Sequence, residues 1–140
     1  MEITSNAVQE VAAGSNVLMT NTVIPGGCSI VHRSGSGLVT LRGLTNNQCR
    51  ARFRVTFGAN IALPTGGTVG AISLALAING EGVATTTMIT TPAAVDEYNN
   101  VFSSIFLDVP KGCCSQISVK NISTQAINVQ NANLIVERVA

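Results

Sequence analysis

Hydrophobic and polar residues alternate in short runs along this 140-residue chain. The clearest run is CRARFRVTF, at residues 49–57. Its odd-numbered positions are apolar, whereas its even-numbered positions are Arg50, Arg52, Arg54 and Thr56. Successive side chains of a β-strand point to opposite faces of its sheet. The run therefore predicts a strand with one face in a core and a second face that carries three of the chain's eight cationic residues.

Similar runs, separated by Gly-, Pro- and Asn-rich turn signals, recur along the chain. The other predicted strands are 7–20 in two parts broken at 14–16, 28–33, 38–44, 68–80, 83–90, 98–109, 114–121 and 126–139. Turn signals at a spacing of roughly eight to twelve residues are typical of a sandwich or a barrel. No linker or low-complexity tract divides the chain. The sequence therefore predicts an all-β fold, an antiparallel β-sandwich, as a single domain over residues 1–140.

The TNNQ loop at residues 45–48 predicts a β-hairpin between 38–44 and the arginine strand. This hairpin would place Arg42 beside the other three arginines on one outward face. Four guanidinium groups repel one another unless carboxylates approach them. Glu137 is the expected partner within the chain, and Asp96 and Glu97 of a neighbouring copy could supply others. Such pairs would dock the protein on a partner, and the alternative is a solvated face with weak exposed pairs.

Residues 91–106 carry signals for both a helix and a strand. Pro92 and the acidic pair that follows it resemble a helix start, and Tyr98, Phe102 and Phe106 are four residues apart. The Asn and Ser residues between them disfavour a helix, and the apolar residues also alternate. We expect at most one helical turn near 92–96, followed by a strand.

Two of the predicted strands are apolar on both faces. In 71–78 an Ile/Leu row lies opposite a row of small residues, and in 98–109 the aromatic row lies opposite Val101, Ile105 and Leu107. A sandwich strand needs one apolar face, and exposed apolar rows are unfavourable in a monomer. We therefore expect another copy of the chain to cover the second faces, rather than a flat and weakly polar outer face. The candidate contact residues are Arg42, Arg50, Arg52, Arg54, Ala71, Ser73, Ala75, Ala77, Tyr98 and Phe102.

The composition supports self-association and does not indicate nucleic acid or a membrane as a partner. Charged residues make up 11% of the chain, hydrophobic residues 46%, and the formal net charge is +1. A free monomer normally carries more surface charge. A net charge near zero does not attract nucleic acid or a membrane surface, so neither is an expected partner. The apolar stretches are too short to cross a bilayer and the first residues do not resemble a signal peptide, which predicts synthesis in a cytoplasm.

No motif for catalysis or for a cofactor is visible. Cys28, Cys49, Cys113 and Cys114 contain no C-x-x-C pair, so a metal site is not indicated, and their pairing in disulfides stays open. His32 is the only histidine, and its position near the end of a strand favours a structural role over a hydrolase. We expect no enzyme activity and no cofactor.

Four segments, VQEVAAGSNVLM, ISLALAINGEG, VPKGCCSQISVKNIS and NANLIVERVA, resemble small phage-encoded structural proteins. These proteins look like jelly-roll domains of the tumour-necrosis-factor and C1q class. The resemblance implies a homotrimer in the virion, made in the host bacterial cytoplasm, that binds the major capsid protein or another virion protein as a capsid decoration protein. The alternative is the host-surface-binding head domain of a phage fibre or tail appendage. One Tyr, four Phe and no Trp are fewer aromatic residues than tumour-necrosis-factor domains have, so the threefold contact would use aliphatic and Ala rows.

Overall fold

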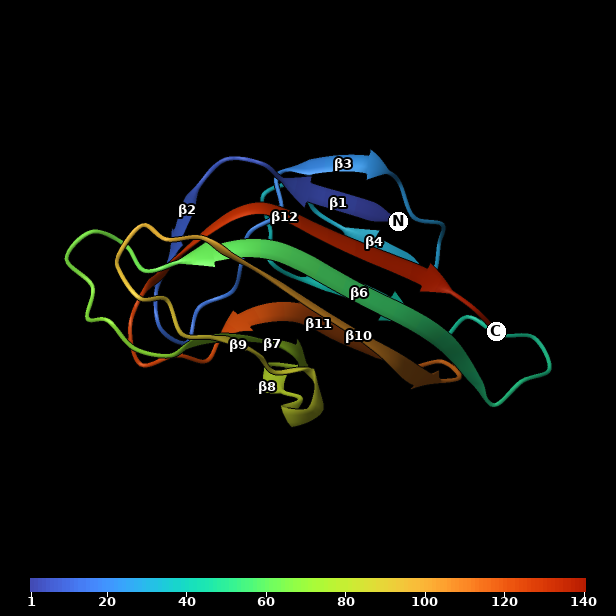
Figure 1. Ribbon diagram of the computed structural model, residues 1–140. Helices are drawn as coiled ribbons and strands as arrows, with labels where there is room; N and C mark the ends of the chain where they lie inside the picture. The colour runs from blue at the N-terminus through green and yellow to red at the C-terminus, as the bar shows by residue number, and fades with distance from the viewer.

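Two antiparallel six-stranded sheets pack face to face (Figure 1). The structure is a computed structural model that describes residues 1–140. The β6 sheet consists of β1 (Glu2–Ser5), β2 (Gln9–Val11), β3 (Asn21–Ile24), β6 (Arg50–Ala62), β10 (Asn99–Pro110) and β12 (Ile127–Arg138). The β7 sheet consists of β4 (Ile30–His32), β5 (Val39–Arg42), β7 (Ile72–Ile78), β8 (Glu81–Gly82), β9 (Met88–Thr90) and β11 (Cys114–Asn121).

The strand order explains which residues become neighbours. The β6 sheet has the order β10-β6-β12-β1-β3, with β2 also paired to β12. The β7 sheet has the order β4-β5-β11-β7-β8, with β9 also paired to β7. The predicted antiparallel sandwich is therefore confirmed. The only helical element is the three-residue 3-10 turn η1 (Ala84–Thr86). No helix of this chain has the length and apolar character needed to cross a membrane.

The alternation in the arginine strand decides which face of β6 enters the core. Ala51, Phe53, Val55 and Phe57 are at most 1% exposed, whereas the arginines between them lie on the outer face. The inward rows of both sheets form one cluster of 27 buried hydrophobic residues. Burial of apolar surface between the two sheets is the main favourable contribution to folding.

Several predicted strands agree with the structure, and some do not. The strands predicted at 98–109, 114–121 and 126–139 correspond to β10, β11 and β12. No helical turn forms at 92–96, because the N–H of Asp96 donates to the carbonyl of Leu63 at 2.9 Å and the chain turns directly toward β10. The segment 7–20 forms only β2 and an isolated bridge of Asn16 to Lys120.

The predicted hairpin between 38–44 and the arginine strand is wrong. β5 pairs with β4 and β11 in the β7 sheet, whereas β6 pairs with β10 and β12 in the other sheet. The connection 43–49 crosses between the sheets. Gly43 holds the crossing, since its N–H donates to the carbonyl of Cys113 at 2.8 Å and its carbonyl accepts from the N–H of Gly112 at 3.0 Å. A turn signal specifies a local bend, but it does not specify the partner strand.

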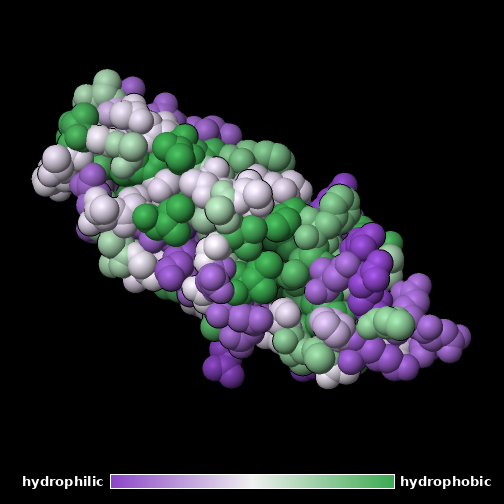
Figure 2. Space-filling model, turned by 90° about the horizontal axis from the view of Figure 1, so that it is seen from below, coloured by the Kyte–Doolittle hydropathy of each residue, from purple (hydrophilic) through white to green (hydrophobic).

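The long strands give the molecule two distinct ends. The loop 43–49, the turn 111–113 and the C-terminus lie at one end, which we call the Lys111 end (Figure 1). The loops 63–71 and 91–98 lie at the opposite end, which we call the Glu97 end. Seen from below, hydrophobic residues occupy the middle of the surface and hydrophilic residues gather toward the Lys111 end (Figure 2).

Candidate functional site

The outer face of the β6 sheet carries the arginine row and its carboxylates. Asp108 lies opposite Arg52 in the β10–β6 register, and Glu137 lies opposite Arg54 in the β12–β6 register. Arg52 binds Asp108 with two hydrogen bonds, from Nε to Oδ1 at 2.7 Å and from Nη2 to Oδ2 at 2.9 Å. Arg50 also pairs with Asp108, with Nε 2.9 Å from Oδ2. Arg54 pairs with Glu137.

This arrangement confirms one prediction and supplies a residue that the sequence did not reveal. Glu137 is the expected carboxylate of the last strand. Asp108 is the partner of two arginines, but its proximity depends on the register of β10 against β6, which no local pattern shows. The expected contribution of Asp96 and Glu97 from a neighbouring copy stays a prediction.

Asp108 and Arg52 shift one another's protonation equilibria. The side-chain hydrogen bond from Arg52 lowers the pKa of Asp108, against a smaller opposing effect of desolvation, and the charges of Arg52 and Arg50 lower it further. The same hydrogen bond raises the pKa of Arg52. Both side chains are solvent-exposed, so their pairing orients the arginine more than it stabilises the fold.

Two phenylalanine side chains project from β10 on the same outer face. Phe102 is 65% exposed and Phe106 is 61% exposed. Phe102 lies opposite Gly58 in the register, and a Cβ at Gly58 would be 3.8 Å from the Phe102 ring. The missing side chain at Gly58 therefore leaves the ring lying over the sheet backbone. The predicted opposite row is confirmed as inward, with Val101 buried and Ile105 and Leu107 packed against the core.

The apolar character of this face extends to the neighbouring strand. Ile135 of β12 is 39% exposed and pairs with Thr56 of β6, which in turn pairs with β10 on its other side. Tyr98 is 37% exposed and precedes β10. The candidate contact residues predicted from the sequence include Phe102 but not Phe106. The spacing of four residues between the two rings was the sequence signal that could have identified Phe106.

The small-residue row of β7 is covered by the chain itself, which corrects one prediction. Ala75 and Ala77 are 1% and 0% exposed, so neither is available to a second copy. β8 pairs beside β7 in the same sheet, and a Cβ at Gly82 would be 4.0 Å from the Cβ of Ala75 on the shared face. Thr86 of η1 continues this edge, because its Oγ1 accepts from the N–H of Leu76 at 3.0 Å.

Three further predicted contact residues, Ala71, Ser73 and Arg42, differ in exposure and in position. Ala71 is exposed and Ser73 is half-buried, so their contact with a second copy stays a prediction. Arg42 is exposed, but it lies opposite Cys114 in the β7 sheet. The expected place of Arg42 in the arginine row of β6 is therefore wrong, because β5 and β6 lie in different sheets.

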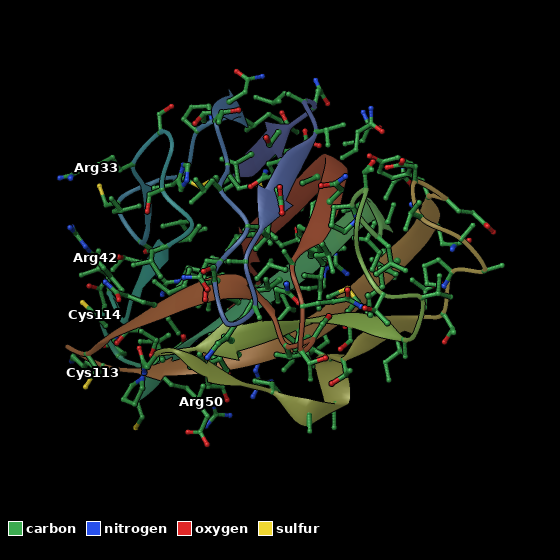
Figure 3. All side chains as sticks on the ribbon, turned by 90° about the vertical axis from the view of Figure 1, so that its left-hand side faces the viewer. Arg33, Arg42, Arg50, Cys113 and Cys114 are labelled. Atoms are coloured by element: carbon green, nitrogen blue, oxygen red, sulfur yellow. The ribbon has the colours of Figure 1, made fainter.

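The four cysteines are free and exposed, and they lie at the Lys111 end. The carbonyl of Cys49 accepts from the N–H of Lys111 at 2.9 Å, and Cys28 precedes Ser29, whose carbonyl accepts from the N–H of Arg42 at 2.8 Å. Cys113 and Cys114 point away from the sandwich along the same side as Arg42 (Figure 3). No group of three or more His, Cys, Asp or Glu side chains could hold a metal ion. His32 donates from Nε2 to the carbonyl of Ser36 at 2.9 Å.

Comparisons with known proteins show the fold. No protein-family model and no curated protein match the sequence. The chain is similar to the globular domain of zebrafish complement 1qA protein, with a TM-score of 0.68 and 10% identity over 99% of this chain and 95% of that domain. It also matches the C-terminal domain of EclA, described as a sugar-binding protein, with a TM-score of 0.43 and 14% identity over 95% of this chain and 79% of that chain. The protein is an all-β, two-sheet antiparallel jelly roll of the C1q type.

Proposed function

We propose that this protein is a non-enzymatic structural component of a phage particle, which self-associates as a homotrimer and decorates the outer shell of the capsid. The observation that carries the proposal is the exposed pair of Phe102 and Phe106 on the outer face of the β6 sheet. The virion assignment rests on the resemblance of the sequence segments described above.

The energetics of the phenylalanine pair support association through this face. Burial of one Phe side chain contributes roughly 1.5–3 kcal/mol relative to its exposure. Two rings on one strand, beside Ile135, form the kind of apolar cluster that marks an interaction site. The arginines next to the rings are already paired with Asp108 and Glu137, so this part of the face can approach another protein with much of its charge compensated.

A closed ring of copies would bury this face on every copy and leave none of it exposed. Closed point symmetry is the usual outcome for soluble homo-oligomers, and the threefold form follows from the C1q-type resemblance. On a symmetric shell, many weak contacts of such a trimer add by multivalency, so that each copy needs little affinity for the capsid protein.

Exchange of both phenylalanines for serine tests the proposal. We expect the wild-type protein to sediment as a trimer, and the Phe102→Ser/Phe106→Ser variant to sediment as a folded monomer, because the apolar contact is lost. Ile89→Ser is the matched control, since Ile89 is also 65% exposed but lies on β9 of the other sheet. This control should remain trimeric. A wild-type monomer at high concentration, or a trimeric double variant with unchanged circular dichroism, contradicts the proposal.

Copy number on purified particles separates decoration from the alternative of a fibre or tail head domain. A decoration protein contacts each repeat of the shell, so we expect its stoichiometry to be comparable with that of the major capsid protein. Quantitative mass spectrometry of purified particles measures this ratio. A few copies per particle would favour the host-surface-binding head domain instead.

A further inference from the structure

The charged residues are segregated along the long axis of the sandwich. Six of the eight cationic residues lie at the Lys111 end or on the adjoining third of β6, and two carboxylates accompany them, Asp108 and Glu137. These cations are Arg42, Arg50, Arg52, Arg54, Lys111 and Arg138. Counting side chains alone, the Lys111 end has an excess of four positive charges.

The opposite end is acidic. Glu10, Asp96 and Glu97 are exposed there, and β2 and the loops 63–71 and 91–98 contain no Lys or Arg. Lys120, the second-last residue of β11, is a cation on a strand that reaches this end, so the excess there is two negative charges. The Oγ1 of Thr65 donates to Asp96 at 3.0 Å, which holds that carboxylate at the loop surface. Glu10 and Thr65 line the same surface hollow, so the acidic groups belong to one end face.

The two charged ends cannot contact each other within one copy. β6 connects them with 13 residues, which at the rise of a strand corresponds to about 40 Å. The excess cations and the acidic end are therefore both left without a partner of opposite charge in the chain. A second copy carries the complementary end.

We propose that the Lys111 end of one copy binds the Glu97 end of a second copy, in a head-to-tail contact separate from the phenylalanine face. A hollow of about 330 Å³ at the Lys111 end, lined by Gln48, Cys49, Arg50, Arg52 and Ala140, has room for a carboxylate side chain of the partner copy. Arg50 and Arg52 at this hollow already pair with Asp108, whereas Arg42 and Lys111 at the same end have no carboxylate partner in the chain. Arg42 and Lys111 are therefore the cations that a carboxylate of the partner copy would meet. Two Lys111 ends repel each other, as do two Glu97 ends, so copies associate only head to tail.

Such a contact has physical consequences that distinguish it from the trimer. It is heterologous, so it extends copies into a row rather than closing a ring. It joins solvent-exposed charges, so salt weakens it strongly as the Debye length falls from about 30 Å at 0.01 M to about 3 Å at 1 M. The apolar phenylalanine contact is not weakened by salt in this way.

Charge reversal at each end, followed by mixing, tests the head-to-tail contact. At an ionic strength of about 0.01 M we expect sedimentation to show species larger than the wild-type oligomer found at about 1 M. Arg42→Glu/Lys111→Glu/Arg138→Glu leaves the Lys111 end with three arginines and five carboxylates, and Glu10→Lys/Glu97→Lys leaves the Glu97 end with three lysines, including Lys120, and one carboxylate. Each variant should lose the larger species, since both of its ends then carry the same sign. An equimolar mixture of the two variants should restore them, because acidic-ended and cationic-ended copies can alternate.

The control is Glu81→Lys, which reverses an exposed charge on β8 away from both ends and should leave the larger species intact. Absence of salt-sensitive species in the wild type, or a mixture that fails to reassociate although both variants are folded, overturns the proposal. Loss of the trimer in the phenylalanine variant leaves this result unaffected, so the two proposals fail separately.

Cross-linking provides a second test that does not require charge reversal. All four native thiols are at the Lys111 end, so Glu97→Cys adds one thiol at the other end. Under mild oxidation we expect this variant to form a ladder of disulfide-linked species on a non-reducing gel. The ladder should disappear when Cys28, Cys49, Cys113 and Cys114 are replaced by serine in the same chain. That variant has one thiol per chain and can form no product longer than a dimer. A disulfide-linked dimer would join two Glu97 ends and would contradict the head-to-tail contact.

Discussion

Replacement of Phe53 by alanine is expected to lower the free energy of unfolding by about 3–5 kcal/mol. Phe53 is 0% exposed, and it is among the largest fully buried side chains of the core. It lies between Leu107 of β10 and Arg138 of β12 in the register of the β6 sheet, and its ring points inward into the core between the two sheets. Alanine leaves a cavity that the surrounding strands cannot fill, because both sheets are fixed by their hydrogen bonds.

Urea denaturation followed by circular dichroism measures this loss. Phe106→Ala is the matched control, since it removes the same ring from an exposed position of the adjacent strand. At a dilution where both proteins are monomeric, we expect the control to change stability by no more than about 0.5 kcal/mol. Equal losses for the two variants would show that burial in the sandwich is not what makes Phe53 important.

Replacement of Gly43 by alanine is the second substitution with a large expected effect. A Cβ at this position would be 2.0 Å from the carbonyl oxygen of Pro110 and 2.9 Å from its carbonyl carbon. Both atoms are backbone, so the chain itself must move. Such overpacking costs at least about 1–3 kcal/mol, and here it also breaks the hydrogen bonds that join Gly43 to Cys113 and Gly112. We expect a lower melting temperature and a displaced Lys111 end.

Gly70→Ala is the control for this substitution. No atom lies within 4 Å of a Cβ at Gly70, and its backbone is not in the left-handed region, so alanine should leave the melting temperature unchanged or raise it slightly. The Gly43 variant should also lose the salt-sensitive head-to-tail species, since the crossing at Gly43 positions Arg42. An unchanged melting temperature for Gly43→Ala would refute the close approach of β5 to the end of β10.

The relation between sequence and structure differs from strand to strand. The alternation of 49–57 predicted both the strand and its buried face, because a repeat of two is a property of each extended residue and does not depend on a partner. The same reasoning located β10, β11 and β12 and the two faces of β10. It missed β1 and β3, which are four residues each and form by pairing against longer strands.

The interaction surface was only partly visible in the sequence. Phe102 and the three arginines of β6 were candidates because they were on the second face of a predicted strand. Ala75 was a candidate for the same reason, but it is 1% exposed in the folded chain. Whether a second apolar face meets solvent, another part of the chain or another copy is a question of three-dimensional packing, which periodicity does not address.

The sequence by itself determined that the chain is all-β, which residues of the long strands are buried, and that a second apolar face exists. Only the tertiary structure decided that β5 and β6 lie in different sheets, that Asp108 pairs with Arg50 and Arg52, and that six of the eight cations gather toward one end while Glu10, Asp96 and Glu97 lie at the other. The physical reason is the separation along the chain of the residues that decide each feature. The direction of a side chain follows from its own backbone, whereas strand partners and charge neighbours follow from how distant segments bury their apolar surface together.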